Sequence, residues 1–181
     1  MSGRAEGPGG GVVSDRATRA DHNTCGWRSG AVSGFSSVVA LAAAGAIGLL
    51  VQQPWIFPSL GPTIMVMAET PAQPAARPWN VLSGHLVGVV TGYLALLVTG
   101  LSQAPPATQQ GLTVPRIVAA CLSLAVTALV LQILHLPHPP AGATTLLVSL
   151  GILTTPIQLL TILLSVLLIT IVMTMINKGR R

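Results

Sequence analysis

Two short segments rich in proline, glycine and threonine carry the residues best suited to chemistry. Pro58–Met65 and Pro139–Leu146 share the pattern Pro-x-x-Gly-x-Thr-x-apolar. A helix that begins inside a membrane presents unpaired N–H groups and a partial positive charge, which together suit an anion. Transporters often build substrate sites from discontinuous helices of this kind. The residues that we expect at such an anion site are Gly61, Thr63, Gly142, Thr144 and Thr145.

The same two segments have a purely structural alternative. Proline kinks a buried helix, and threonine hydroxyls can donate to carbonyl groups one turn earlier in their own helix. The shared pattern is also short, and its residue types are common in this chain. The sequence therefore leaves the anion site and the structural kink both open.

Three histidines are the only side chains of the apolar body that titrate near neutral pH. His85 and His138 are candidates to hydrogen-bond a ligand or to carry a proton, whereas His135 is expected at the membrane interface. The spacing of His135 and His138 would suit a metal on a continuous helix, but the prolines around them interrupt one. No further ligands cluster here, so we expect neither a metal nor a cofactor.

A polar group lies between the second and third apolar segments. We expect Asn80 to contact the substrate and Arg77 to form a gate or an anion-attracting rim, with plain interfacial solvation as the alternative. Glu69 is the only acid between Arg28 and Lys178, which excludes a pair of carboxylates. A Ser-His-Asp triad would also lack its acid unless Glu69 served. We therefore expect no enzyme activity.

The elements that hold these residues follow from how few charges the chain has. Charged residues make up 7% of the sequence, and the mean hydropathy is +0.73. Residues 29–68, 78–115 and 117–177 carry no charge, so the body lacks the material for a water-exposed surface. The net charge of +5 comes from the two ends, whose few basic residues fit the flanks of membrane helices and argue against nucleic-acid binding. The sequence predicts a polytopic integral membrane protein.

Six apolar segments follow a polar stretch. We interpret residues 1–28 as a disordered tail and 29–181 as a transmembrane domain. Four segments have the length of about 20 residues that crosses a bilayer, and two are short and broken by proline and glycine. The expected fold class is all-α, a transmembrane bundle of four full-length helices and two short membrane segments in two repeats. In chain order the segments are Val32–Val51, Trp55–Ala68, Val81–Leu101, Ile117–Leu136, Pro139–Leu153 and Pro156–Ile176.

The direction of the two halves stays open. If the short segments enter and return on one side, the halves run parallel and Arg77 lies on the side opposite the C-terminus. If they cross, with extended residues at their start, the halves are inverted and Arg77 lies on the side of the C-terminus while Arg116 lies opposite. Small residues at four-residue spacing favour close helix packing in either case. They form two stripes, Ala40, Ala44, Gly48 and Gly84, Gly88, Gly92.

Three stretches give the chain a family resemblance. His138–Thr145 resembles the signature of the HPP family of integral membrane proteins, which is named for its His-Pro-Pro. Arg77–Leu86 is similar to that family's Pro-x-Asn-Val-x-x-Gly-His block, and Pro58–Gly61 is a weaker match to a Gly-Ala-Ser type motif. The order and spacing of the three agree over residues 33–176. The resemblance implies a multi-spanning membrane domain, which in photosynthetic relatives is associated with nitrite transport.

The chain departs from the family pattern near the expected site. Trp79 stands where the family often has arginine, and Pro62 and Thr63 replace a small Ala-Ser pair. We nevertheless expect a transporter or channel for a small inorganic anion, with nitrite as the leading candidate. The alternative is a non-transporting membrane scaffold or subunit that docks a partner protein.

The expected setting follows from the same observations. The protein should contact the lipid bilayer and a small anion, and it should form a homodimer on general grounds of symmetry. We expect it in the plasma membrane with both termini in the cytoplasm, a plastid membrane being the second choice.

Overall fold

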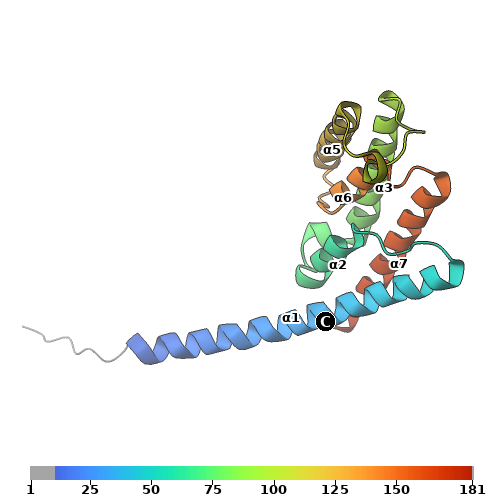
Figure 1. Ribbon diagram of the computed structural model, residues 1–181. Helices are drawn as coiled ribbons and strands as arrows, with labels where there is room; N and C mark the ends of the chain where they lie inside the picture. Colours follow the sequence, from blue (N-terminus) through green and yellow to red (C-terminus); the bar gives the residue numbers. More distant parts are fainter. Residues whose placement is uncertain (1–10, 181) are drawn as a thin grey trace, which may run out of the picture.

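The helices follow the order that the apolar segments predict. The structure is a computed structural model that describes residues 11–180, with side chains described from Gly26 onward. The described residues form helices and contain no strand (Figure 1). The elements are α1 (Gly11–Val51), α2 (Leu60–Glu69), η1 (Pro74–Ala76), α3 (Pro78–Val98), α4 (Ala107–Gln110), α5 (Val114–Ile133), α6 (Ala141–Ser149) and α7 (Pro156–Gly179).

The predicted mixture of long and short membrane helices is confirmed. By length and composition α3, α5, α7 and the part of α1 over Gly26–Val51 can each cross a membrane. The short helices α2 and α6 have 10 and 9 residues. Each rises only about 15 Å, half of a hydrocarbon core of roughly 30 Å. Each short helix can therefore run from the middle of a bilayer to one surface.

The first helix begins earlier than the sequence suggested. α1 starts at Gly11, so residues 11–28, which we interpreted as part of a disordered tail, are helical, and residues 1–10 lie outside the described part. Figure 1 shows α1 extending beyond the rest of the bundle. Once the membrane helix exists, each added residue gains a backbone hydrogen bond without a new nucleation step. The helix thus continues across residue 29, and the domain boundary expected there stays a prediction.

The helices contact one another in a pattern that repeats between the halves. The long first helix of each half packs on its own short helix, α1 on α2 and α5 on α6. Each short helix also packs on the last helix of the other half, α2 on α7 and α6 on α3. The first helix of each half packs there as well, α1 on α7 and α5 on α3. If α1, α2 and α3 are exchanged with α5, α6 and α7, the set of contacting pairs stays the same, as an internal two-fold axis requires.

The two halves are inverted. Arg77, just before α3, and Lys178, at the end of α7, line the same surface pocket, so α3 and α7 run in opposite directions. Arg116 lies away from this pocket and donates to the carbonyl oxygen of Ser149 at the end of α6. Of the two arrangements that the sequence left open, the structure has the one with inverted halves. Non-helical residues, 52–59 and 134–140, precede the two short helices.

Glycines allow α6 to lie directly on the backbone of α3. A Cβ at Gly88 would lie 2.8 Å from the carbonyl oxygen of Ala141, and one at Gly92 would lie 2.8 Å from that of Thr145. Such distances exclude a side chain, because neither backbone can move aside. Gly84 continues the same stripe toward the start of α6. The packing role predicted for this stripe is confirmed.

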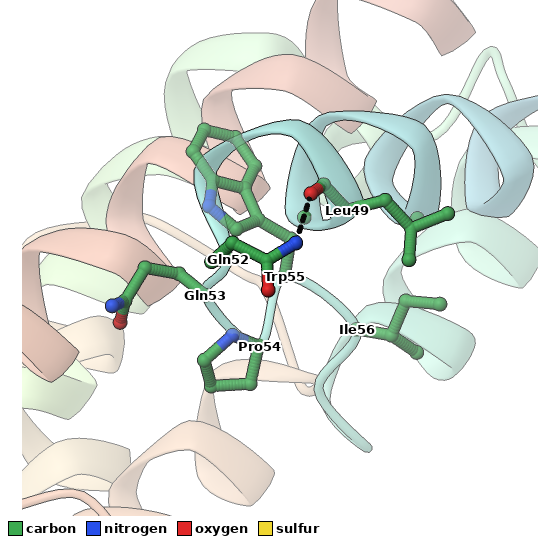
Figure 2. A pocket seen from close by; sticks show the side chains of 8 residues that line it. Leu49, Gln52, Gln53, Pro54, Trp55 and Ile56 are labelled. Atoms are coloured by element: carbon green, nitrogen blue, oxygen red, sulfur yellow. Dashed lines mark hydrogen bonds between the residues drawn. The ribbon is translucent and has the colours of Figure 1, made fainter.

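The residues of the second stripe, Ala40, Ala44 and Gly48, have two different roles. Ala40 and Ala44 are fully buried in the core, as expected of a packing face. Gly48 instead makes room for the turn after α1, since a Cβ there would lie 2.9 Å from the carbonyl oxygen of Gln53. Figure 2 shows this turn, where Gln52 donates from Nε2 to the carbonyl oxygen of Leu49 at 2.7 Å. The turn borders an open hollow of about 550 Å³, which contains none of the residues predicted for the site.

Candidate functional site

A single imidazole joins the starts of the two short helices. His85 of α3 is fully buried, and each of its ring nitrogens has a threonine partner. Nε2 lies 2.9 Å from the hydroxyl of Thr63 on α2, and Nδ1 lies 2.7 Å from the hydroxyl of Thr144 on α6. Thr63 and Thr144 are the equivalent positions of the duplicated sequence pattern. The internal repeat thus brings its two threonines to opposite sides of one histidine.

A second histidine extends the cluster toward the loop before α3. His138 Nε2 lies 3.2 Å from His85 Nε2 and 3.5 Å from the hydroxyl of Thr63. The other ring nitrogen, His138 Nδ1, lies 2.9 Å from the carbonyl oxygen of Ala75 in η1. His138 comes from the proline-rich segment before α6, where Pro139 and Pro140 delay the helix and leave the histidine free to turn inward.

The hydrogen-bond partners set the tautomers of the neutral rings. A carbonyl oxygen only accepts, so His138 carries its proton on Nδ1 and donates to Ala75. Its Nε2 then accepts, which places the proton of His85 on Nε2. His85 Nδ1 is left as an acceptor, and the hydroxyl of Thr144 donates to it. The Thr63 hydroxyl donates to the carbonyl oxygen of Ser59 at 2.9 Å, so its oxygen accepts from His85.

The cluster is closed. Thr63, His85 and Thr144 have no exposed surface, and His138 is 1% exposed. The polar groups satisfy one another by direct contact, as buried groups in a membrane domain must. A ligand of this cluster would therefore have to displace one of these hydrogen bonds.

Two predicted residues support the cluster from outside. Asn80 is buried and donates from Nδ2 to the carbonyl oxygen of Pro74 at 2.8 Å, which holds η1 against the start of α3. The described structure gives it no hydrogen bond to the buried histidines, and its role as a substrate contact stays a prediction. Arg77 is exposed and lines a pocket of about 170 Å³ with Lys178. This position fits the rim predicted for Arg77, and Thr174 and Asn177 complete the polar part of the lining.

The two glycines of the repeated pattern do not reach the cluster. Gly61 is exposed, with no atom within 4 Å of a Cβ placed on it, and a Cβ on Gly142 would meet only the side chain of Leu124. The first amides of α6 also have partners already, since the N–H of Gly142 donates to the carbonyl oxygen of Pro139. An anion held at these two glycines would therefore lie apart from the histidine cluster, and a binding role for Gly61 and Gly142 stays a prediction. Side chains, not backbone amides, form the centre of the site.

Thr145 belongs to a neighbouring cluster. Its hydroxyl lies 2.9 Å from that of Thr127 on α5, which in turn lies 2.6 Å from that of Thr91 on α3. The three hydroxyls link α3, α5 and α6, and each also lies within hydrogen-bond distance of a carbonyl oxygen four residues earlier in its own helix. Thr145 therefore holds helices together, as the structural interpretation of these threonines proposed.

Two further polar residues matter that the sequence did not single out. Ser59, at the start of α2, is fully buried, and its hydroxyl has no hydrogen-bond partner among the described residues. Its place directly after Pro58 was the available signal, because serine often precedes a helix. Arg116 is 2% exposed and donates to the carbonyl oxygens of Ser149 and Pro105. A cation at the end of α6 is stabilised by the helix dipole.

The comparison with known proteins identifies a family. A family model described as the HPP transmembrane region matches residues 22–180. No curated protein and no solved structure matches the chain.

Proposed function

The chain belongs to the HPP transmembrane family, and from that premise we propose that it transports a small inorganic anion, with nitrite as the leading substrate. The observation that carries the proposal is the convergence of Thr63 and Thr144 on His85. Two inverted halves, each with a short helix that begins in the middle of the bundle, are the architecture of many secondary transporters. Their substrate sites lie where the repeats meet.

The chemistry of the cluster favours an anion over a cation. It offers hydroxyl and imidazole N–H donors, and no carboxylate lies in the spans to repel negative charge. Hydrogen bonds to a charged acceptor contribute about 1.5–3 kcal/mol, against about 1 kcal/mol for neutral pairs. An anion that replaces the contact of His85 with Thr63 or Thr144 can therefore offset the hydrogen bond that it breaks. The unpaired hydroxyl of Ser59 adds a donor one turn away.

The basic pocket supplies a way for the anion to reach the bundle. Arg77 and Lys178 place two positive charges at one end, next to the η1 segment that contacts His138. A concave basic surface raises the local concentration of anions. Rocking of one half against the other would then expose the cluster to each side in turn.

Uptake into proteoliposomes tests the proposal. We expect the purified protein to take up nitrite faster than protein-free liposomes do, with saturation at high concentration. Nitrate and formate, added as competitors, rank the substrate preference. If none of the three anions enters faster than through protein-free liposomes, transport of small anions is refuted. A membrane scaffold that docks a partner would then be the better interpretation.

A further inference from the structure

The hydrogen bonds around His85 form a continuous chain that leads out of the cluster. It runs from Thr144 to His85, then to His138, and ends at the carbonyl oxygen of Ala75. Ala75 is half-buried, and its neighbour Ala76 lines the basic pocket. One end of the chain is thus sealed in the centre of the bundle, and the other lies beside a solvent-accessible surface.

The hydroxyl of Thr144, the first donor of this chain, does not bond to a carbonyl oxygen of its own helix as other threonines here do. The hydroxyls of Thr63 and Thr145 each contact the carbonyl oxygen four residues earlier, at Ser59 and Ala141. Within the described part of the chain, the hydroxyl of Thr144 has His85 as its one hydrogen-bond partner. Its hydrogen is therefore free to point at the imidazole, whereas that of Thr63 points away from it.

All three hydrogens of the chain point toward η1. The hydroxyl of Thr144 donates to His85 Nδ1, and His138 Nδ1 donates to Ala75. The one Nε2 hydrogen of His85 is shared between His138 Nε2 at 3.2 Å and the hydroxyl oxygen of Thr63 at 2.9 Å. This order follows from the carbonyl at the end, which can only accept. A chain with one common direction can pass a proton by a series of short transfers.

We propose that Thr144, His85 and His138 relay a proton from the centre of the bundle to the pocket of Arg77 and Lys178, one for each anion transported. The inference rests on the proposed function and adds the coupling ion to it. When rocking of the halves exposes the cluster, a hydronium ion, or the conjugate acid of the anion, gives a proton to the oxygen of Thr144 as the hydroxyl hydrogen passes to His85 Nδ1. The Nε2 proton of His85 moves to His138 Nε2, and the Nδ1 proton of His138 leaves to water at η1. Each atom gains one proton and loses one, so only the tautomers of the two rings change.

The surroundings of the relay include one competing acceptor, the hydroxyl oxygen of Thr63, which lies 2.9 Å from His85 Nε2. The elements packed against His85 present Thr63 from α2, Thr144 from α6 and His138 from the preceding loop. Within the described residues no carboxylate or cation hydrogen-bonds to either imidazole.

Replacing His138 separates proton movement from anion movement. In proteoliposomes that contain a pH-sensitive dye, the parent should move protons whenever it moves nitrite, after subtraction of the nitrous acid that leaks through protein-free liposomes. H138Q keeps a donor for Ala75 but cannot pass a proton on. We expect the number of protons moved per nitrite to fall at least about tenfold, whatever rate of nitrite transport the variant retains.

A matched control and a second variant keep the test decisive. H135Q makes the same substitution at an exposed histidine nearby and should leave both rates unchanged. N80A removes the hydrogen bond that holds η1 and should weaken coupling without touching the histidines. If the parent moves nitrite without protons, or if H138Q still moves as many protons per nitrite as the parent, the relay is wrong.

Nitrogen-15 NMR of the histidine-labelled protein in lipid tests the chain independently of transport. We expect His138 protonated on Nδ1 and His85 on Nε2, as the hydrogen bonds require. The reverse tautomers would overturn the relay even in a protein that transports nitrite. The expected tautomers in a protein that moves no anion would instead show that the proposed function has failed, and the coupled relay with it.

Discussion

Replacing Thr144 with valine removes one hydrogen-bond donor from the proposed site and leaves its shape. Valine has nearly the volume of threonine, so α6 can keep its packing on α3. His85 Nδ1 loses its one partner, the hydroxyl at 2.7 Å, and is left buried and unpaired. A bound anion also loses this donor, and a hydrogen bond to a charged acceptor contributes about 1.5–3 kcal/mol, where every 1.4 kcal/mol corresponds to about a tenfold change in an equilibrium or a rate. We expect nitrite uptake to fall about tenfold.

The assay is the initial rate of nitrite uptake at several concentrations, together with thermal unfolding in detergent. Thr161→Val is the matched control, because the hydroxyl of Thr161 is also largely buried but donates only to the carbonyl oxygen of Ile157 at 2.7 Å. We expect the control to transport within about twofold of the parent, since such a neutral hydrogen bond contributes about 1 kcal/mol or less. Equal uptake by the two variants would refute the assignment of Thr144 to the site.

Three further outcomes follow from the packing and the charges. G88A places a Cβ 2.8 Å from the carbonyl oxygen of Ala141 and should destabilise the protein by about 1–3 kcal/mol, measured as a lower midpoint of thermal unfolding, whereas G61A meets no atom within 4 Å and should not lower it. Arg116→Gln leaves carbonyl groups at the end of α6 without their cation and should cost about 2 kcal/mol in the same measurement. Exchanging Arg77 and Lys178 together for glutamine should raise the KM for nitrite about threefold and reduce its dependence on salt, with kcat unchanged. An unchanged unfolding midpoint in G88A or Arg116→Gln would contradict the packing and charge arguments, and an unchanged KM in the double variant would contradict the role of the basic pocket.

The sequence was sufficient for the architecture because segment length decides it. Twenty apolar residues cross a bilayer as a helix, whereas Trp55–Ala68 and Pro139–Leu153 are too short and broken by proline, so four long and two short membrane segments could be predicted from the sequence. The direction of the halves could not, because the basic residues balance in both arrangements. It became visible only when Arg77 and Lys178 were found in one pocket.

The site was predictable where chemistry alone selects residues. His85 and His138 were expected because polar side chains inside a membrane are costly, and both are buried in the same cluster. The direction in which each residue of a short helix points was not predictable, because it depends on how that helix is rotated about its axis. Thr144 turns to His85 while Gly142, two residues earlier, turns to Leu124.

The burial of Arg116 could not be predicted from the sequence, for a different reason. An arginine at the start of an apolar segment resembles an interfacial flank, and only the fold brings the carbonyl oxygens of Pro105 and Ser149 to it. The orphaned hydroxyl of Ser59 likewise depends on how α2 enters the bundle. The role of Arg116 depends on contacts between residues distant in the sequence, and that of Ser59 depends on how a helix is placed. Neither can be inferred from the neighbouring residues in one sequence.

Nitrite uptake by His85→Gln, beside the parent and H135Q, tests the site most directly. Glutamine retains a donor and an acceptor, but its single amide cannot take the place of a ring that contacts Thr63 on one nitrogen and Thr144 on the other. We expect the parent and H135Q to take up nitrite at similar rates and His85→Gln to fall to the rate of protein-free liposomes while remaining folded. Uptake by His85→Gln at the parent rate would contradict a transport site centred on His85.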